Sequence, residues 1–198
     1  MTRFLLIRHG QNDTIGVRFA GRMPGIKLND EGRRQADDLA ERLARQNIAA
    51  VYSSPIERAL QTARPLASRL DLEVQAVDEF TELDMGEWTG RDFEEVRECS
   101  YFQLFNEFRI CTPAPDGELM LDAQARMIKG LLRLRSKHQG QTVAVVSHAD
   151  PIKTAICYFL GLSLDMYHRF ELDPASVSIV ELGTDAAKVL VLNGNGNI

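Results

Sequence analysis

Short apolar runs that end in polar residues alternate with longer segments of helical period along most of the chain. The runs that predict strands are residues 4–7, 48–52, 74–77, 141–147, 177–182 and 188–192. The segments in which apolar residues recur at helical spacing are 30–44, 55–70, 119–138 and 151–160. This alternation favours an α/β domain with a mostly parallel central sheet. The last two strands flank Gly183-Thr184 and predict a terminal hairpin.

Three of the predicted helices carry start signals. Asp30 is expected to cap the first helix, and Pro55 suits the first turn of the second. In Ala149-Asp150-Pro151 the aspartate is expected to cap the last helix, with the proline at its first position. That helix start would aim backbone N–H groups at a cleft.

Two stretches have no clear period. Residues 10–29 carry scattered Gly, Asn, Asp and Pro, which is a long loop for a compact domain and therefore a candidate functional one. Residues 71–117 contain one predicted strand, a glycine-punctuated loop and two short amphipathic helices, and we interpret them as an excursion over the cleft. We expect one domain over 1–198, with a frayed tail at 193–198.

Composition excludes several classes of protein. The chain has 198 residues, of which 44% are hydrophobic and 26% charged, as in an ordinary globular domain. A net charge of -5 argues against nucleic acid or an anionic membrane as a partner. No apolar run approaches the ~18 residues of a membrane span, so we expect a cytoplasmic protein. Cys99, Cys111 and Cys157 lack C-x-x-C spacing and are expected to be structural.

Two histidines stand at the ends of predicted parallel strands. Arg8-His9-Gly10 closes the first apolar run, and Ser147-His148 closes the fourth. Ligands of such sheets bind outside the carboxyl ends of the strands, so both imidazoles are expected to face one cleft. A single histidine after a strand is more often structural, but the pair favours phosphoryl transfer through a covalent histidine.

Arginines near the same edge could bind the phosphoryl group. Arg58 follows Ser53-Ser54 on the first turn of the second helix, where its guanidinium can fork onto two phosphate oxygens. Arg18 and Arg22 in the long first loop bring positive charge to the same side and are kept as candidate substrate contacts. For each of them, an ordinary solvated arginine is the alternative.

Residues 82–90 contain the candidates for the general acid that would protonate the leaving group. Glu82 lies among apolar neighbours that would raise its pKa toward that of a general acid. Asp84 and Glu87 lie nearby, so the choice among the three carboxylates stays open at this point.

Together these motifs resemble the histidine phosphatase superfamily, also called the phosphoglycerate mutase-like family. In chain order they are Arg8-His9-Gly10, the segment from Leu28 to Ala36, Ser53-Ser54-Pro55 with Arg58-Ala59 and Thr62-Ala63, Glu82 with Gly86 and Gly90, and Ser147-His148. Five motifs in this order make the resemblance specific. It implies an α/β/α fold, His9 as the nucleophile that becomes phosphohistidine, Glu82 as proton donor, and Arg8, Arg58 and a protonated His148 around the phosphoryl group. It requires no metal or organic cofactor.

The chain departs from the family pattern at two places. Gln11 stands where many members have Glu, and either Asn12 or Thr14 takes the place of a phosphate-binding Asn in the first loop. Ala149-Asp150 follows the second histidine where many members have Gly-Gly. The backbone of Ala149 is expected to bind phosphate, whereas Asp150 would weaken that binding unless it turns away as a cap.

The resemblance implies a phosphomonoester hydrolase acting on a small phosphorylated metabolite, with a small-molecule phosphate ester as partner and a homodimer left open. The alternatives are a cofactor-primed phosphoglycerate mutase and a non-catalytic phospho-ligand binding module. Mutases of the family are typically longer, with a segment that closes over the substrate. Residues 91–117 are short and contribute only Arg91, Arg97 and Arg109, so a phosphatase that admits water is favoured.

Overall fold

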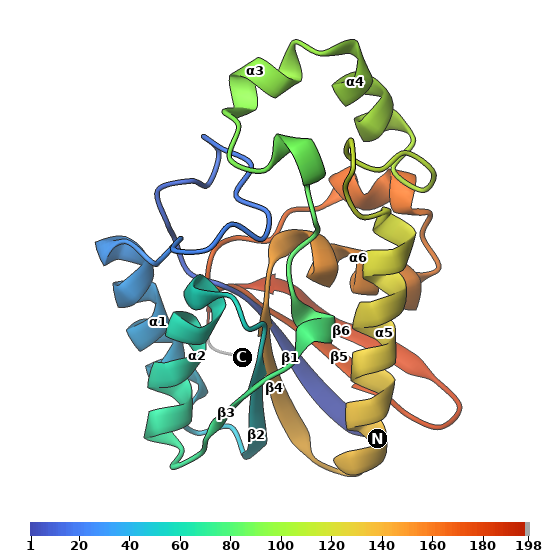
Figure 1. Cartoon of the computed structure of the whole chain (residues 1–198). Helices are drawn as coiled ribbons and strands as arrows, with labels where there is room; N and C mark the ends of the chain where they lie inside the picture. Colours follow the sequence, from blue (N-terminus) through green and yellow to red (C-terminus); the bar gives the residue numbers. More distant parts are fainter. Residues whose placement is uncertain (197–198) are drawn as a thin grey trace.

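Six strands form one mixed sheet in the computed structural model, which describes residues 1–196 (Figure 1). They are β1 (Thr2–Arg8), β2 (Ile48–Ser53), β3 (Val74–Ala76), β4 (Thr142–Ser147), β5 (Val177–Leu182) and β6 (Ala187–Gly194). Their order across the sheet is β3-β2-β4-β1-β5-β6. The first four of these are parallel to one another, whereas β5 and β6 are antiparallel to their neighbours. The mostly parallel sheet and the terminal hairpin are thereby confirmed.

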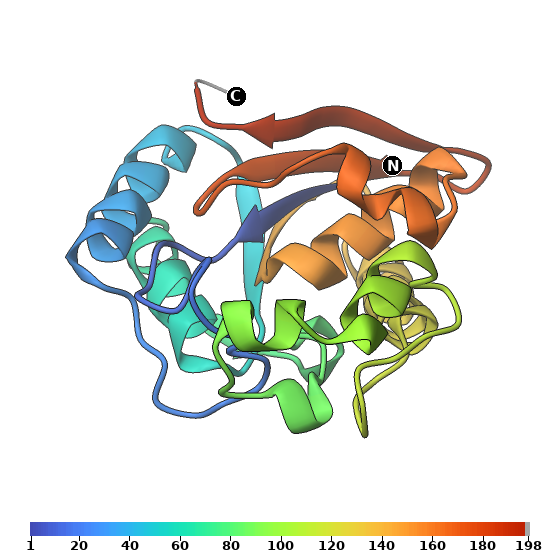
Figure 2. The same cartoon turned by 90° about the horizontal axis from the view of Figure 1, so that it is seen from above.

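Helices cover both faces of the sheet. The four long ones are α1 (Asp30–Leu43), α2 (Glu57–Arg69), α5 (Met120–Lys137) and α6 (Ala149–Leu160). The short ones are η1 (Asp78–Phe80), η2 (Gly86–Trp88), α3 (Phe93–Arg97), α4 (Ser100–Glu107) and η3 (Leu164–Arg169). Seen from above, α1 and α2 lie on one side of the sheet and α5 on the other, with α3 and α4 above its edge (Figure 2). Within residues 1–196 no helix has the length and apolar character that a membrane crossing needs.

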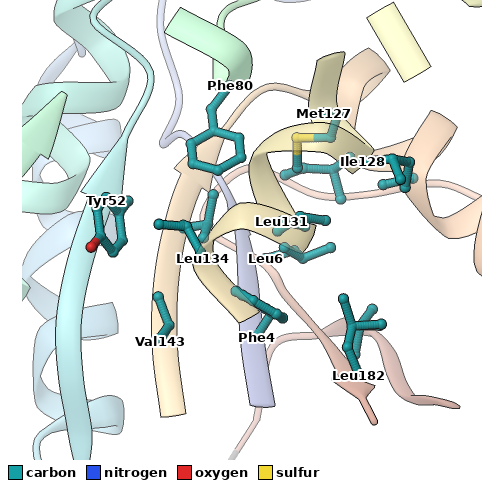
Figure 3. Close-up of a cluster of buried hydrophobic side chains, with 14 of the residues drawn as sticks. Phe4, Leu6, Tyr52, Phe80, Met127, Ile128, Leu131, Leu134, Val143 and Leu182 are labelled. Atoms are coloured by element: carbon teal, nitrogen blue, oxygen red, sulfur yellow. The ribbon is translucent and has the colours of Figure 1, made fainter. Parts of the chain in front are cut away.

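Both faces of the central strands are buried, which explains their continuous apolar runs. Side chains such as Phe4, Leu6 and Val143 point toward α5 and α6 (Figure 3). Their neighbours Leu5 and Ile7 point to the opposite face and pack against α1 and α2. Each fully buried side chain of this kind contributes about 1.5–3 kcal/mol of hydrophobic free energy. The polar ends of these strands are therefore held on a rigid base.

The starts of α1 and α2 differ from the prediction. Asn29 caps α1, because its side-chain oxygen accepts a hydrogen bond from Gly32 N (2.9 Å). Asp30 is already helical, and its carboxylate pairs with Arg33 instead. Pro55 precedes α2 rather than lying in its first turn, because the chain is still extended at the residue that follows it.

Smaller expectations also change. Cys99 and Cys111 are exposed, so the prediction that all three cysteines are structural is wrong for these two, whereas Cys157 is fully buried in α6. The tail is ordered further than expected, since β6 continues to Gly194 and Asn193 hydrogen-bonds to Asp173. Positions 197–198 of the expected frayed tail lie outside the described residues.

Candidate active site

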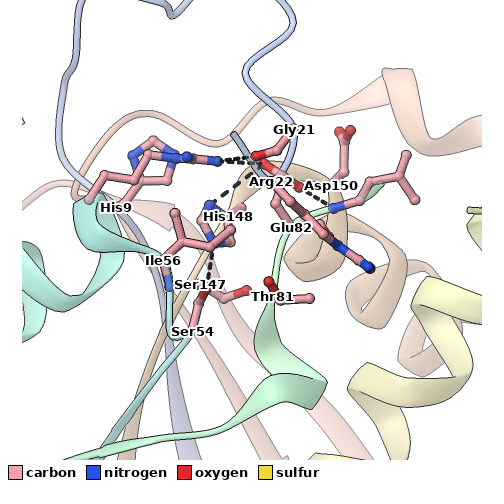
Figure 4. Close-up of polar contacts among 12 residues, drawn as sticks. His9, Gly21, Arg22, Ser54, Ile56, Thr81, Glu82, Ser147, His148 and Asp150 are labelled. Atoms are coloured by element: carbon pink, nitrogen blue, oxygen red, sulfur yellow. Dashed lines mark hydrogen bonds and ion pairs between the residues drawn. The ribbon is translucent and has the colours of Figure 1, made fainter. Parts of the chain in front are cut away.

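The two strand-end histidines meet at the carboxyl edge of the sheet. Strands β1 and β4 are parallel neighbours, with Arg8 opposite Ser147, so both strands end at the same level. His9 and His148 follow directly, and their ring centroids lie 5.1 Å apart (Figure 4). Both residues are buried, with 4% and 0% of their surface exposed. The sheet thus brings together two imidazoles that stand far apart in the sequence.

The hydrogen bonds of His9 fix which nitrogen is free to react. Its Nδ1 lies 2.8 Å from the Gly10 carbonyl oxygen, which can only accept, so Nδ1 carries the proton. The other nitrogen, Nε2, accepts a hydrogen bond from Arg58 Nε (3.2 Å). Burial, together with the charges of Arg58 and Arg8, holds the pKa of His9 well below its ordinary value. The ring is therefore neutral, with an unprotonated Nε2.

Two glycines let the start of α1 pack against the loop after His9. A Cβ on Gly10 would lie 2.7 Å from the Gly32 carbonyl oxygen. A Cβ on Gly32 would lie 2.0 Å from the Gln11 carbonyl oxygen. Thr62 on α2 adds a hydrogen bond from Gly10 N to its hydroxyl oxygen (3.0 Å). Side chains larger than hydrogen at either glycine would push the nucleophile out of place.

The buried Arg58 and the half-buried Arg8 flank His9, and each has a buried donor that is unpaired within residues 1–196. Arg58 lies in the first turn of α2 and is 1% exposed; its Nη2 donates to the Gly21 carbonyl (2.9 Å), while Nη1 has no hydrogen-bond partner. Arg8 donates from Nη1 to the Leu172 carbonyl, while its Nε has no partner. Burial lowers the pKa of both guanidinium groups, because their charge is only partly compensated. These unpaired donors make the site attractive to an anion.

Burial in this arrangement favours a neutral His148 ring, whereas the resemblance implies a protonated one beside the phosphoryl group. Burial, followed by the nearby charge of Arg58, holds its pKa well below the ordinary value. Its Nε2 lies 2.8 Å from Ser54 Oγ, which can donate because it already accepts from Ile56 N. The ring proton then sits on Nδ1, which has no hydrogen-bond partner and lies 3.7 Å from Glu82 Oε2.

Glu82 differs from the other two candidate acids in its burial and in its position. Burial raises the pKa of its carboxyl group to about 7, and the charge of Asp150 adds to the rise while that of Arg58 opposes it. Its Oε1 accepts a hydrogen bond from Leu83 N (2.9 Å). Glu82 lines the cavity beside His9, whereas Asp84 and Glu87 do not. A carboxyl group with this pKa is protonated in a substantial fraction of molecules near neutral pH.

Arg126 on α5 holds the backbone that carries Glu82, a role that sequence reasoning missed. Its guanidinium donates to the carbonyl oxygens of Glu79 (2.9 Å), Thr81 (2.6 Å) and Glu82 (3.1 Å), and also binds the Glu118 carboxylate. The only signal in the sequence is an arginine directly before Met127, on the buried side of the helix. This signal does not identify the carbonyl groups that Arg126 binds, because they belong to a distant part of the chain.

Three of the four candidate contacts predicted in the first loop line the cavity: Asn12, Thr14 and Arg18, whose Nε also donates to Asp92 Oδ1 (3.0 Å). Of these, Asn12 is buried. The side-chain oxygen of Asn12 accepts from Thr14 N (2.9 Å) and Thr14 Oγ1 (2.6 Å), which leaves the Asn12 amide nitrogen as the unengaged donor. Arg22 does not line the cavity; it donates to the Glu82 carbonyl (2.9 Å) and binds Glu118 (2.9 Å).

The start of α6 differs from the predicted Asp150 cap. His148 is the last extended residue, so Ala149 opens the helix and Pro151 is its third residue rather than its first. The side chain of Ala149 does not line the cavity, although its N–H is one of the free donors of the helix start. Asp150 is not the cap, because Tyr167 Oη donates to its carboxylate (3.0 Å) and holds it toward the cavity.

The cavity extends well beyond the histidines, over a volume of about 570 Å³. Its proximal end contains Arg8, His9, Arg58 and Glu82. Its distal end lies beneath residues 93–112, which we call the strap. The distal lining is Phe93, Arg97, Phe102, Asn106, Arg109, Lys153, Tyr167, His168 and Glu171. A volume of this size suits a small metabolite.

One group of side chains could in principle hold a metal ion. His9, Glu82 and His148 each offer one ligand atom, and these atoms lie within 4.8 Å of one another. Such nitrogen and oxygen donors are those that zinc accepts. However, Arg58 donates to His9 Nε2 itself, and the charge of Arg8 lies next to it, so a dication would meet two adjacent positive charges. The charges around these donors suit an anion instead.

Comparison with known proteins agrees with this geometry. Residues 4–195 match the histidine phosphatase superfamily, branch 1. The chain belongs to this superfamily. The phosphatase is 34% identical to phosphoserine phosphatase 1 of Hydrogenobacter thermophilus over 98% of this chain and 92% of the relative. The expected resemblance and the phosphatase assignment are thereby confirmed.

Solved structures extend the likeness to the whole fold. The phosphatase superposes on Bacillus stearothermophilus YhfR with a TM-score of 0.91 and 25% identity, covering 100% of this chain and 99% of that one. It is also similar to a mutant phosphoserine phosphatase from Entamoeba histolytica in complex with phosphoserine (TM-score 0.88, 28% identity, 98% and 97% coverage). A second structure of the Entamoeba enzyme contains 3-phosphoglyceric acid.

Proposed function

We propose that this phosphatase hydrolyses small phosphomonoesters through a phosphohistidine formed on His9. The observation that carries the proposal is a set of buried donors without partners around that ring: Arg8 Nε, Arg58 Nη1 and His148 Nδ1. A buried donor left unpaired costs about 1–3 kcal/mol. Three of them beside one neutral imidazole fit a phosphoryl group, whose oxygens would accept from all three.

The first half-reaction transfers the phosphoryl group to the enzyme. His9 Nε2 attacks phosphorus in line with the ester oxygen, the P–N bond forms and the P–O bond to the alcohol breaks. The carboxyl group of Glu82 gives its proton to the departing oxygen, for which its raised pKa suits it. The Gly10 carbonyl keeps the proton of the other imidazole nitrogen in place throughout.

The second half-reaction returns the enzyme to its starting form. A water molecule attacks phosphorus, and the Glu82 carboxylate takes one of its protons. The P–N bond breaks, inorganic phosphate leaves, and Nε2 regains its lone pair. In both steps the guanidinium groups of Arg8 and Arg58 offset the charge on the equatorial oxygens, which accounts for most of the catalysis in transfers of this kind.

The relatives support a small phosphorylated metabolite as the substrate. The Hydrogenobacter relative is named a phosphoserine phosphatase, and the Entamoeba enzyme was solved with phosphoserine and with 3-phosphoglyceric acid. The cavity here continues beyond the phosphate-binding end and has room for a group of that size. Asn12 and the N–H of Ala149 are proposed as further phosphate contacts, whereas Arg22 acts by holding the Glu82 backbone.

Trapping the intermediate tests this function. Purified enzyme is mixed briefly with a ³²P-labelled phosphomonoester and quenched in base, since phosphohistidine survives base and is lost in acid. We expect a base-stable, acid-labile label on wild-type protein and none on the His9→Ala variant. Arg69→Met, a change on the exposed side of α2, is the control and should label as wild type does. A label that persists in His9→Ala would refute the assignment of the nucleophile.

The mutase alternative is separated by a second assay. The strap contains only short helices, of 5 and 8 residues, which is little protein to shield phosphohistidine from water. With 3-phosphoglycerate and a bisphosphoglycerate primer we therefore expect release of phosphate. Conversion to 2-phosphoglycerate faster than phosphate release would identify a mutase. Absence of p-nitrophenyl phosphate turnover above the blank would indicate a binding module.

A further inference from the structure

The distal end of the cavity holds an arginine whose charge has no anionic partner within residues 1–196. Arg109 in the strap is only 5% exposed, and its guanidinium carbon lies 4.1 Å from the ring centroid of Phe105 and 4.5 Å from that of Tyr167. Its Nη2 donates to Asn106 Oδ1 (2.6 Å), while Nε and Nη1 have no hydrogen-bond partner in the described part of the chain. Burying a charge without an opposite charge is costly, and the reaction described above does not use this one.

Lys153 is a second buried cation at the same end. It lies on α6, is 3% exposed, and its Nζ is 4.6 Å from the Tyr167 ring centroid. Its ion-pair partner is Glu171 (2.9 Å), whose side chain is 73% exposed. The Tyr167 ring is therefore in contact with both cations, and within residues 1–196 the only carboxylate paired with either of them lies largely in solvent.

A carboxylate stands between the two ends of the cavity. Asp150 accepts one hydrogen bond through Oδ1, from Tyr167, and lines the cavity. Its charge acts on both Arg8 and Glu82, which places it close to the phosphate-binding residues. An anion at this point stabilises the nearby Arg8 cation but repels the phosphate of a substrate, and it attracts a positive charge on the same substrate.

Resting on the proposed function, we propose that the distal end binds the head group of an O-phosphorylated α-amino acid. Arg109 and Lys153 bind its carboxylate, and Asp150 binds its ammonium group. A neutral sugar would leave the Arg109 guanidinium unpaired. A carboxylate without an ammonium group would leave the Asp150 charge uncompensated beside the phosphate. A substrate that carries both charges near the phosphate ester offers a partner to the Arg109 guanidinium and to the Asp150 carboxylate together, with Lys153 adding positive charge at the carboxylate.

Carboxylate binding involves an adjustment of the strap. The unpaired Nε and Nη1 of Arg109 are covered by protein atoms, so an anion reaches them by passing between the strap and η3. A hydrogen bond from Ile110 N to Asp165 Oδ1 (3.1 Å) joins these two segments at the surface. Phe105 lies in the strap with Arg109, so its ring stays against the guanidinium when the strap moves away from Tyr167 on η3.

Two substrate pairs isolate the two proposed contacts. Phosphoserine and phosphoethanolamine differ only in the carboxylate, and phosphoserine and 3-phosphoglycerate differ at C2, where ammonium replaces hydroxyl. The ratio of kcat/KM within each pair is measured for each protein, so that a general loss of activity cancels. In wild type we expect phosphoserine to be favoured by about tenfold or more in both pairs, the usual scale of a charge-assisted hydrogen bond.

The variants separate the contacts. We call the kcat/KM ratio of phosphoserine to phosphoethanolamine the carboxylate ratio, and that of phosphoserine to 3-phosphoglycerate the ammonium ratio. Arg109→Met, which keeps an apolar chain between the two rings, should bring the carboxylate ratio close to one and leave the ammonium ratio high. Asp150→Asn should do the reverse. Arg109→Lys, which keeps the charge and spares the fold, should retain part of the carboxylate ratio. Arg133→Met and Asp37→Asn, on exposed helix surfaces away from the cavity, should keep both wild-type ratios.

Several outcomes would overturn the subsite. One is a wild-type enzyme that does not distinguish the members of either pair. Another is an Arg109→Met variant that is folded by circular dichroism and keeps the wild-type carboxylate ratio. If that variant does not fold, the Arg109→Lys and Lys153→Met variants replace it. An unchanged carboxylate ratio in both of them would also overturn the subsite. In both cases p-nitrophenyl phosphate turnover persists and the proposed function stands. If the wild-type enzyme hydrolysed none of these phosphomonoesters, the proposed function itself would be refuted.

Discussion

The two ends of the cavity are built in different ways. At the proximal end, His9 and His148 follow paired strands of the sheet, and Arg58 lies in the first turn of a helix packed against it. At the distal end, Arg109 is held by the rings of Phe105 and Tyr167, which lie on short helical segments. Backbone pairing thus fixes the reacting groups, whereas side-chain packing fixes the groups that face the rest of the substrate.

A small aromatic cluster joins the strap to η2 and to the first loop. Trp88 lies 5.0 Å from Phe105 and 5.7 Å from Phe102 between ring centroids, and Phe19 of the first loop stacks on Phe93 at 5.1 Å. Each pair contributes about 0.5–1.5 kcal/mol beyond the burial of its area. A substitution here can reshape the distal end without changing the strands that carry the histidines. Chemistry and substrate choice are therefore separable in this fold.

Removal of the nucleophile is the strongest test of the proximal end. We expect His9→Ala to lower p-nitrophenyl phosphate turnover by about 10⁴-fold or more, because the remaining groups bind phosphate without forming a covalent bond. Steady-state assay at saturating substrate measures this. Residual activity above about a hundredth of wild type would mean that water attacks phosphorus directly.

Glu82→Gln should separate substrates by their leaving groups. For an alkyl phosphate, whose alcohol needs a proton, we expect kcat/KM to fall by about 10²–10⁴-fold. For p-nitrophenyl phosphate the loss should be much smaller, since nitrophenolate leaves without one. Because both substrates are measured with the same variant, any loss of activity that results from misfolding affects both equally and cancels in the ratio. Equal losses would indicate a structural role for Glu82 and reopen the case for Asp84 or Glu87.

The burial of Glu82 has a cost that is measurable in stability. Its pKa in the folded protein is about 7 against an ordinary value of 4.5, so between these values the native state binds more protons than the unfolded state. Its contribution to stability therefore falls as pH rises from about 4.5 to 7. Relative to wild type, Glu82→Gln should gain up to about 3 kcal/mol at pH 8 and little at pH 4.5, as measured by urea unfolding. A gain that does not depend on pH would contradict this account.

Asp150 joins the two ends of the cavity, and its effect on the acid should be modest. Because its charge helps to raise the pKa of Glu82, Asp150→Asn should shift the alkaline limb of kcat/KM for an alkyl phosphate to lower pH. The acid limb, set by His9 with a pKa well below 6.5, should stay in place. Asp37→Asn on the exposed face of α1 is the matched control. An unmoved alkaline limb would show that burial alone sets the pKa of Glu82.

The smallest expected effect is that of chelation. The proposed chemistry uses the charges of Arg8 and Arg58, so EDTA should leave kcat and KM unchanged. Vanadate should compete with substrate, since it resembles the phosphoryl group in the transition state. Complete loss of activity with EDTA, restored by Zn²⁺, would assign His9, Glu82 and His148 as metal ligands after all.

The proximal end could be predicted from sequence, because its signals are local. An apolar run predicts a strand, and the residue directly after it is predicted to lie at the edge of the sheet where ligands bind. His9 and His148 both occupy such a position. The fold class followed from the same alternation of runs. Where the site depended on contacts between distant segments, sequence reasoning failed, as it did for Arg126 and Lys153.

Two local signals were misleading for the same reason. Asp-Pro after His148 has the composition of a helix start, but Asp150 is drawn toward the cavity by Tyr167, which is a tertiary contact. Arg22 lies in a cationic loop near the nucleophile, but the Glu82 carbonyl and Glu118 engage its guanidinium. Where a side chain has several potential partners, the tertiary structure decides which of them it binds, and its neighbours in sequence do not.

The adjacency of β1 and β4 also governs when activity can emerge during folding. The two strands stand far apart in the sequence, yet they are hydrogen-bonded side by side, with Phe4 opposite Val143. Closing so long a loop is a slow, entropically costly step. The histidines come together only after it, so the return of turnover during refolding reports the formation of this strand pair. A fragment that ends before β4 can contain the nucleophile and still have no active site.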